Sequence, residues 1–207
     1  MSPGATMERV YRDLKRQIMN GHFAPGERLD PARLAPDLGA STSPVRDALH
    51  RLSGERLIEA WQQEGFRQPQ LAEADLQDLY GWAQHLLELA LRRDAAGLLA
   101  ADHQPMLAGT GDYAERMLGL FGAIAQRAAN LELRRALLSV AERCHHLRRG
   151  ELIIDPHCEA ALAAMEELLR EEQTELLRRE LQRFHRSRIR QASALIVILR
   201  PRQPPHF

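Results

Sequence analysis

The chain has 207 residues, enough for one large domain or two small ones. Its 28 basic and 28 acidic residues cancel, which excludes a protein that coats nucleic acid through net charge alone. Apolar residues make up 44% of the sequence and aromatic residues 5%, which favours a hydrophobic core built from helices. The sequence shows no apolar run of membrane-spanning length, no signal peptide and only two cysteines, so we expect a cytoplasmic protein that contacts no membrane.

The first part of the chain predicts two helices and a tight turn. Apolar residues recur at helical spacing over residues 7–18, and Gly21 provides a left-handed cap at the end of that helix. Asp30-Pro31 begins a second helix, which ends at Gly39. Gly39 and the two residues after it form the short turn that a helix-turn-helix requires.

A third helix follows this turn, with Ser43 as its predicted cap and Pro44 at its first position. Its apolar residues share one inward face: Val45, Ala48, Leu49 and Leu52. The residues that face outward near its N-terminal end are Thr42, Ser43, Arg46 and His50. A short helix with hydrogen-bonding side chains on its leading edge suits the DNA major groove, and its N-terminus can meet phosphate.

A small hairpin is predicted after the third helix. The pattern predicts a strand at residues 57–61 and a second strand at residues 66–68. Between them, residues 62–65 can reverse the chain. Three helices followed by a hairpin predict a winged helix. Because residues 1–67 carry a net charge of only +1, we expect a localised contact face.

The ordered motifs resemble those of GntR-family bacterial transcription regulators over about residues 7–70. The matching residues are Val10-Tyr11, Gly21, Pro25-Gly26-Glu27-Arg28-Leu29, Leu34-Ala35, Leu38-Gly39, Ser43-Pro44-Val45-Arg46-Asp47-Ala48-Leu49, Leu57-Ile58 and Gly65. Residues 71–80 look like the junction to the all-helical effector domain of the FadR-like subfamily, known as the FCD domain. The rest of the chain resembles that domain more loosely.

The resemblance implies a mainly α fold with two domains. Residues 1–70 would form a winged helix-turn-helix with a small β-hairpin wing, and residues 71–207 an antiparallel helical bundle that binds an effector and dimerises. The helical spacing in the second region predicts helices at about 75–99, 112–129, 131–149, 157–172 and 174–198. The segment between about residues 95 and 112 is short relative to the family, as if one helix were reduced or missing.

The resemblance implies a homodimeric transcription regulator that acts as a repressor, binds a double-stranded DNA operator and is not an enzyme. The predicted DNA contacts are Arg33, Ser41, Thr42, Ser43, Arg46, His50, Gly65 and Arg67. Arg46 matches a family arginine, and Gly65 matches the glycine at the wing tip. Thr42 stands where family members commonly place an arginine that reaches a guanine, a pair that provides roughly 1–3 kcal/mol of discrimination.

The second region departs from the family at the ligands of a divalent metal. Many FadR-like members hold the metal with one Asp and three His, and the first pair belongs at Leu118 and Gly122 here. His185 matches the last histidine, whereas Ala163 stands at the one before it. A family arginine that can pair with a carboxylate aligns with Ala83. We therefore expect no metal and no other cofactor.

Two hypotheses for the helical region stay open. In the first, the region senses a less acidic small molecule, with Trp82, Arg148 and His185 as candidate effector-binding residues. In the second, it serves only as a scaffold for dimerisation or partner binding. The Cys144-His145-His146 and Asp155-Pro156-His157-Cys158 clusters lack metal-ligand spacing and are interpreted as surface and partly buried residues. The basic run after Leu181, which carries +6, is interpreted as a solvated helix face.

Overall fold

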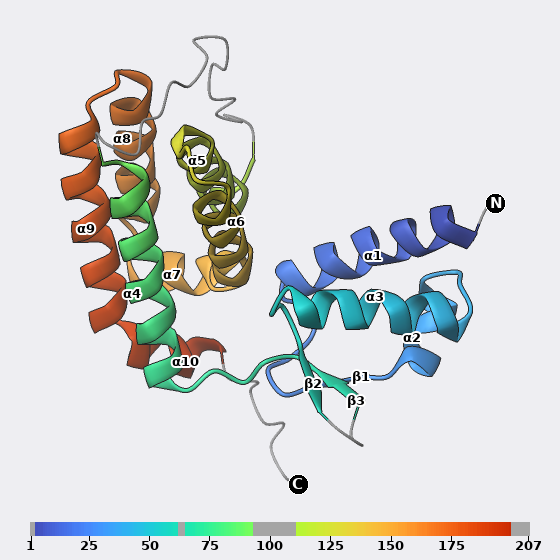
Figure 1. The fold of residues 1–207 in the computed structure, drawn as a ribbon. Coiled ribbons are helices and arrows are strands. Elements are labelled where there is room, and N and C mark those ends of the chain that lie inside the picture. The colour runs from blue at the N-terminus through green and yellow to red at the C-terminus, as the bar shows by residue number, and fades with distance from the viewer. Residues whose placement is uncertain (1–2, 62–64, 93–110, 200–207) are drawn as a thin grey trace, which may run out of the picture. The chain divides into compact units, whose positions relative to one another are not determined.

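A computed structural model describes residues 3–61, 65–92 and 111–199 (Figure 1). The described residues divide into two compact units, one that runs to Leu71 and one that spans Ala72–Leu199. Both are mainly helical, and the first also contains a small antiparallel sheet, so the predicted fold class is confirmed. No helix in the described ranges is long and apolar enough to span a bilayer.

The N-terminal unit is built from three helices and a three-stranded sheet. The helices are α1 (Pro3–Met19), α2 (Pro31–Asp37) and α3 (Thr42–Gly54), and the strands are β1 (Arg28–Leu29), β2 (Glu59–Trp61) and β3 (Gly65–Arg67). The core lies between α1 and α3, where Leu14 and Leu49 are fully buried. The inward stripe predicted for the third helix is confirmed, since all four of its members are buried.

The turns and caps explain where these helices stop. Gly21 and Gly39 have positive φ values of 68° and 54°, as their predicted roles require. The Asp30 carboxylate accepts a hydrogen bond from the backbone N–H of Ala32, which fixes the start of α2. The predicted cap of the third helix was wrong, because α3 begins at Thr42 with Ser41 in the cap position. Pro44 fits the first turn all the same, since backbone N–H groups there have no helical partner.

The sheet differs from the predicted hairpin in two ways. β2 and β3 pair antiparallel as predicted, but Leu57 and Ile58 precede β2 as buried core residues instead of forming part of it. β1 was not predicted; it places Leu29 opposite Phe66 and makes β3 the central strand. A strand of two residues is too short for alternation to reveal it. The reversal was predicted at residues 62–65. Gly65 belongs to β3 instead, and residues 62–64 lie outside the described residues.

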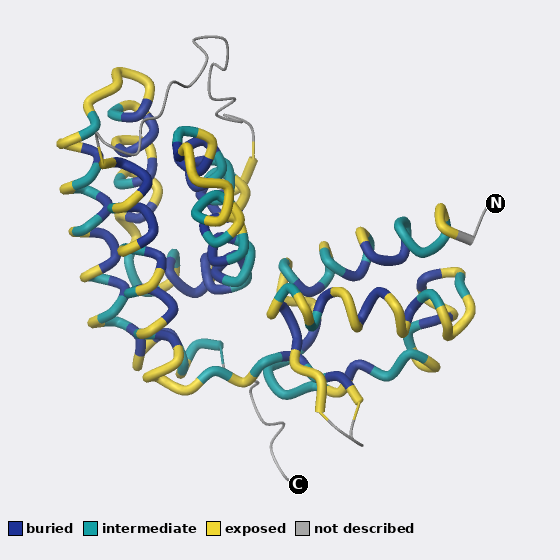
Figure 2. The backbone as a smooth tube through the Cα atoms, in the orientation of Figure 1, coloured by how far each residue is buried: buried dark blue, intermediate teal, exposed yellow. Residues whose placement is uncertain are grey.

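The second unit is a helical bundle. Its helices are α4 (Glu73–Ala90), α5 (Tyr113–Arg127), α6 (Leu131–His145), α7 (Arg148–Ile154), α8 (Cys158–Arg170), α9 (Thr174–Arg190) and α10 (Ala192–Leu199). α5 packs on α6, and α9 packs on both α4 and α8, with buried residues facing inward (Figure 2).

Three of the predicted helix boundaries in this unit need correction. The first helix ends at Ala90, and the continuation expected to residue 99 falls mostly within 93–110, outside the described residues. The segment predicted as one helix over 131–149 is divided after His145, so that α7 is a separate short helix. The last predicted helix is divided at Gln191 into α9 and α10.

Candidate nucleic-acid interface

The leading edge of α3 is open to solvent. Ser41, Thr42, Ser43, Arg46 and His50 are all exposed, while Val45 and Leu49 on the opposite face are fully buried. Within the described part of the chain, Arg46 has no ion-pair partner, so its guanidinium is available to an external acceptor. The neighbouring Asp47 is exposed as well.

Arg9 of α1 holds the turn that leads into α3. Its guanidinium donates to the carbonyl oxygen of Leu38 over 2.9 Å and to that of Gly39 over 3.2 Å. These carbonyls follow the last residues of α2, where no helical N–H is left to bind them. The contact therefore fixes the turn between α2 and α3. Sequence reasoning missed Arg9, because one arginine on a partly exposed helix face carries no distinguishing pattern.

A second set of contacts joins α1 to the C-terminal end of α3. The Tyr11 hydroxyl donates to Glu55 over 2.7 Å, and the Lys15 ammonium donates to the same carboxylate over 2.9 Å. The Arg51 guanidinium lies 3.6 Å from the centre of the Tyr11 ring. Burial raises the pKa of Glu55, but the hydrogen bonds from Lys15 and Tyr11 outweigh burial, and the net pKa is lowered.

The other predicted DNA-contacting residues belong to α2 and the sheet. Arg33 is exposed on α2, and Gly65 begins β3 with a φ of 86°, a conformation that favours glycine. Arg67 is half-buried in β3, opposite Arg28 on one side and Glu59 on the other. The His50 ring packs edge-on against Phe66 at 4.8 Å between centroids, so His50 also joins α3 to the sheet.

Comparison with known proteins identifies this unit. Residues 6–67 match the family model of bacterial regulatory proteins of the gntR family. The N-terminal unit is a GntR-family helix-turn-helix domain. The match covers most of α1 and all of α2, α3 and the sheet, with the exposed edge of α3 inside it.

Named relatives of the chain are transcription regulators. YdhC of Bacillus subtilis, an HTH-type transcriptional regulator, is 37% identical over 81 residues, which are 39% of this chain and 36% of YdhC. The HTH-type transcriptional repressor GlaR of Escherichia coli is 32% identical over 116 residues, which are 52% of this chain and 53% of GlaR. The chain thus spans about half of these relatives or less.

A solved structure resembles the fold over most of the chain. That of McbR/YncC from E. coli matches with a TM-score of 0.60 and 21% identity, and the match covers 93% of this chain and 97% of that chain. At this identity the likeness concerns the fold alone. It extends the similarity from the GntR domain to the helical unit.

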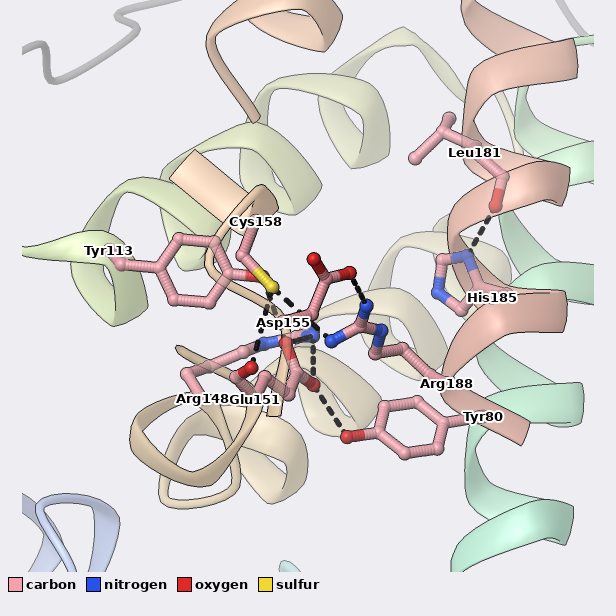
Figure 3. Close-up of polar contacts among 9 residues, drawn as sticks. All are labelled: Tyr80, Tyr113, Arg148, Glu151, Asp155, Cys158, Leu181, His185 and Arg188. Atoms are coloured by element: carbon pink, nitrogen blue, oxygen red, sulfur yellow. Dashed lines mark hydrogen bonds and ion pairs between the residues drawn. The ribbon is translucent and has the colours of Figure 1, made fainter. Parts of the chain in front are cut away.

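The polar centre of the helical unit is Glu151 of α7, which is fully buried (Figure 3). Its carboxylate accepts hydrogen bonds from the hydroxyls of Tyr80, over 2.5 Å, and Tyr113, over 2.8 Å. The Arg148 guanidinium donates to both of its oxygens, over 2.8 and 3.1 Å. Burial raises the pKa of Glu151, but Arg148 and the Tyr80 hydroxyl outweigh burial and hold the net pKa below the ordinary value.

The predicted effector-binding residues do not share one open pocket. Arg148 is buried and is engaged by Glu151, and His185 of α9 is buried beside Phe121 and Phe184. Trp82 of α4 is 49% exposed and lies on a groove of about 530 Å³ that involves neither of the other two. Effector binding by these residues stays a prediction.

The residues around His185 do not fit the divalent metal expected from the resemblance to the FadR-like subfamily. One ring nitrogen, Nδ1, lies 2.8 Å from the Leu181 carbonyl oxygen and donates to it, and the ring packs on Phe121. Leu118 and Gly122 on α5 offer no ligand atoms. No three His, Cys, Asp or Glu side chains gather into a cation site within residues 3–61, 65–92 and 111–199.

The interpretations of the two cysteine-containing clusters and of the basic run after Leu181 were both partly wrong. Cys144 and Cys158 are both buried, and burial raises the pKa of the Cys144 thiol to about 11, so that it stays protonated. Arg188 belongs to the basic run but is buried, where it pairs with Asp155 and donates to the Cys158 sulfur over 3.2 Å. Arg183 and Arg186 are exposed, as a solvated helix face requires. Arg200 and Arg202 lie outside the described residues.

Proposed function

We propose that this chain is a sequence-specific DNA-binding transcription regulator of the GntR family that acts as a repressor. The observation that carries the proposal is the open leading edge of α3 within a domain that matches the gntR family, where Arg46 is exposed and has no ion-pair partner in the described part of the chain. The repressor assignment rests on the relative GlaR, whose name gives it that role. Transcription regulation and repression are proposed for the whole protein, whereas the family match covers residues 6–67 alone.

The DNA contacts follow from where the exposed side chains lie. Arg46 would contact a base edge or a phosphate from α3, and the hydroxyls of Ser41, Thr42 and Ser43 would bind phosphate at the N-terminus of that helix. Arg33 would add a phosphate contact from α2. Arg67 and the β3 glycine, Gly65, would approach the minor groove through the wing.

We further propose that two copies act together as a homodimer through the helical unit, which we assign to the FadR-like type. Two copies of α3 would then enter successive major grooves, about 34 Å apart. The nearly neutral GntR domain supports dimerisation, because one such domain has little charge with which to hold DNA tightly. The chain would carry no metal and no other cofactor.

Effector sensing is the second part of the proposal, and the groove beside Trp82 favours it. The residues that line this groove are Trp82, Leu86, Leu89, Arg92, Asn130, Glu132, Leu133 and Ala136. Its mainly apolar lining, with a few polar groups, suits a small, weakly charged molecule. A melting-temperature rise with one compound of a metabolite panel would support sensing, whereas no response would favour the scaffold alternative.

DNA recognition is tested by selecting duplexes from a randomised library with the full chain. The expected result is an enriched palindrome whose half-sites lie about 10 base pairs apart, centre to centre. The oligomeric state of the protein and of its complex is measured by light scattering on the same samples. A folded protein that enriches no sequence would contradict the proposal, and a monomer on a single half-site would contradict the homodimer.

A further inference from the structure

The surroundings of Glu151 have the composition of a ligand site. Three donors converge on one carboxylate from three different helices: Tyr80 from α4, Tyr113 from α5 and Arg148 from α7. The Arg148 guanidinium lies 5.7 Å from the ring centres of both Phe121 and Phe184, so aromatic walls flank the charged group. Apolar walls with a few converging donors are how proteins bind small carboxylates.

The occupant of this site belongs to the chain itself. Glu151 lies on α7, a helix of seven residues between α6 and α8. Gly150 lets α7 approach α10 closely, because a Cβ atom at that position would collide with the Leu195 side chain. Packing of α7 against α10 therefore holds the Glu151 carboxylate among its three donors.

Loss of this carboxylate would leave strong donors without an acceptor. Arg148 and Tyr80 are fully buried, so water cannot take the place of the carboxylate freely. Beyond its Cβ atom, the glutamate side chain has the same non-hydrogen atoms as acetate. Replacement of Glu151 by alanine would thus leave a space shaped and charged for a small monocarboxylate.

We propose that Tyr80, Tyr113 and Arg148 form a carboxylate-binding site whose resident ligand is the chain's own Glu151. The three donors are thereby satisfied without a diffusible carboxylate. Free carboxylates do not enter this site while Glu151 fills it. The inference concerns the helical unit alone and is independent of DNA binding.

The test is rescue of a Glu151→Ala variant by acetate. Melting temperatures of the full-length wild type, Glu151→Ala and Glu151→Gln are measured in increasing sodium acetate, against sodium chloride at equal ionic strength. Glu151→Ala is expected to melt below the wild type and to recover saturably in acetate but not in chloride. Glu151→Gln fills the same space, so it and the wild type are expected to show no acetate-specific shift. An equal response of all three proteins, or no response of Glu151→Ala, would overturn the proposal.

A second measurement covers the case in which Glu151→Ala does not fold. The conservative variants Tyr80→Phe with Tyr113→Phe, Glu151→Gln, and all three changes together keep the shape of the core. If the hydroxyls act through the carboxylate, the melting temperature of the triple variant is expected to fall by much less than the sum of two losses. These are the loss of the double tyrosine variant and the loss of Glu151→Gln. Additive losses would contradict a shared site, even if the acetate experiment cannot be read.

Discussion

The Arg9 guanidinium lies 2.9 Å from the carbonyl oxygen of Leu38, and this contact ties α1 to the turn of the helix-turn-helix. Arg9 is not among the residues predicted to contact DNA. The orientation of α3 thus depends on a side chain of α1, and this dependence leads to the first prediction.

Arg9→Ala is expected to weaken DNA binding and to lower the free energy of unfolding by about 1 kcal/mol, because it removes charge-assisted hydrogen bonds to two carbonyls. Urea unfolding and a mobility-shift titration on the selected operator measure the two effects. Arg12→Ala is the matched control, since Arg12 is exposed on the same helix and, among the described residues, donates only to the Glu8 carbonyl oxygen within α1. Equal effects of the two substitutions would show that the turn does not need Arg9.

Arg46→Ala is expected to abolish operator binding at protein concentrations that saturate the wild type, while the melting temperature and the oligomeric state stay unchanged. The reason is that Arg46 is exposed and has no partner among the described residues, so only an external contact is lost. Arg135→Ala on α6 serves as the control, because it also removes an exposed arginine; the Arg135 side chain is 66% exposed. Undiminished affinity of Arg46→Ala in a mobility-shift assay would refute the assignment.

Glu55 predicts a pH dependence of stability. Its pKa in the folded chain is lowered, so its contribution is present above the unfolded-state pKa, near 4.3, and is lost as the pH falls through the folded value. Glu55→Gln is therefore expected to cost about 1 kcal/mol at pH 7 and progressively less below pH 4. Urea unfolding at a series of pH values measures this difference. A cost that is independent of pH would mean that the charge of Glu55 contributes nothing.

The purified protein is expected to contain no stoichiometric metal. The positions of the family ligands hold Leu118, Gly122 and Ala163, and the Nδ1 atom of His185 is already engaged by a backbone carbonyl. Elemental analysis of protein purified without chelator measures this directly. One equivalent of zinc or nickel per chain that persists after dialysis would contradict the expectation.

Much of the GntR domain could be predicted because its signals are local. The apolar stripe of α3, the cap at Asp30 and the positive φ of Gly39 each follow from a few neighbouring residues. β1 could not be predicted, since a two-residue strand exists only through its pairing with β3. The start of α3 was misplaced because several residues before Pro44 can act as a cap, and the position of the turn decides among them.

The core of the helical unit was harder to predict because its polar residues are satisfied across helices. Tyr80 and Glu151 are 71 positions apart in the sequence, and nothing near either residue indicates the other. The break that creates α7 has no glycine or proline at His146-Leu147 to mark it. One signal was available: Arg148 and Glu151 are three residues apart, the spacing at which side chains on a helix can pair.

Asp47 is exposed and directly follows Arg46 in the chain, and its carboxylate would affect binding to DNA of random sequence. A carboxylate next to the contacting guanidinium repels phosphates wherever the arginine finds no matching partner. Together with the near-neutral charge of the GntR domain, it would shorten the dwell time on random sequence. We expect a low background of off-target occupancy and a shallow dependence of affinity on salt concentration.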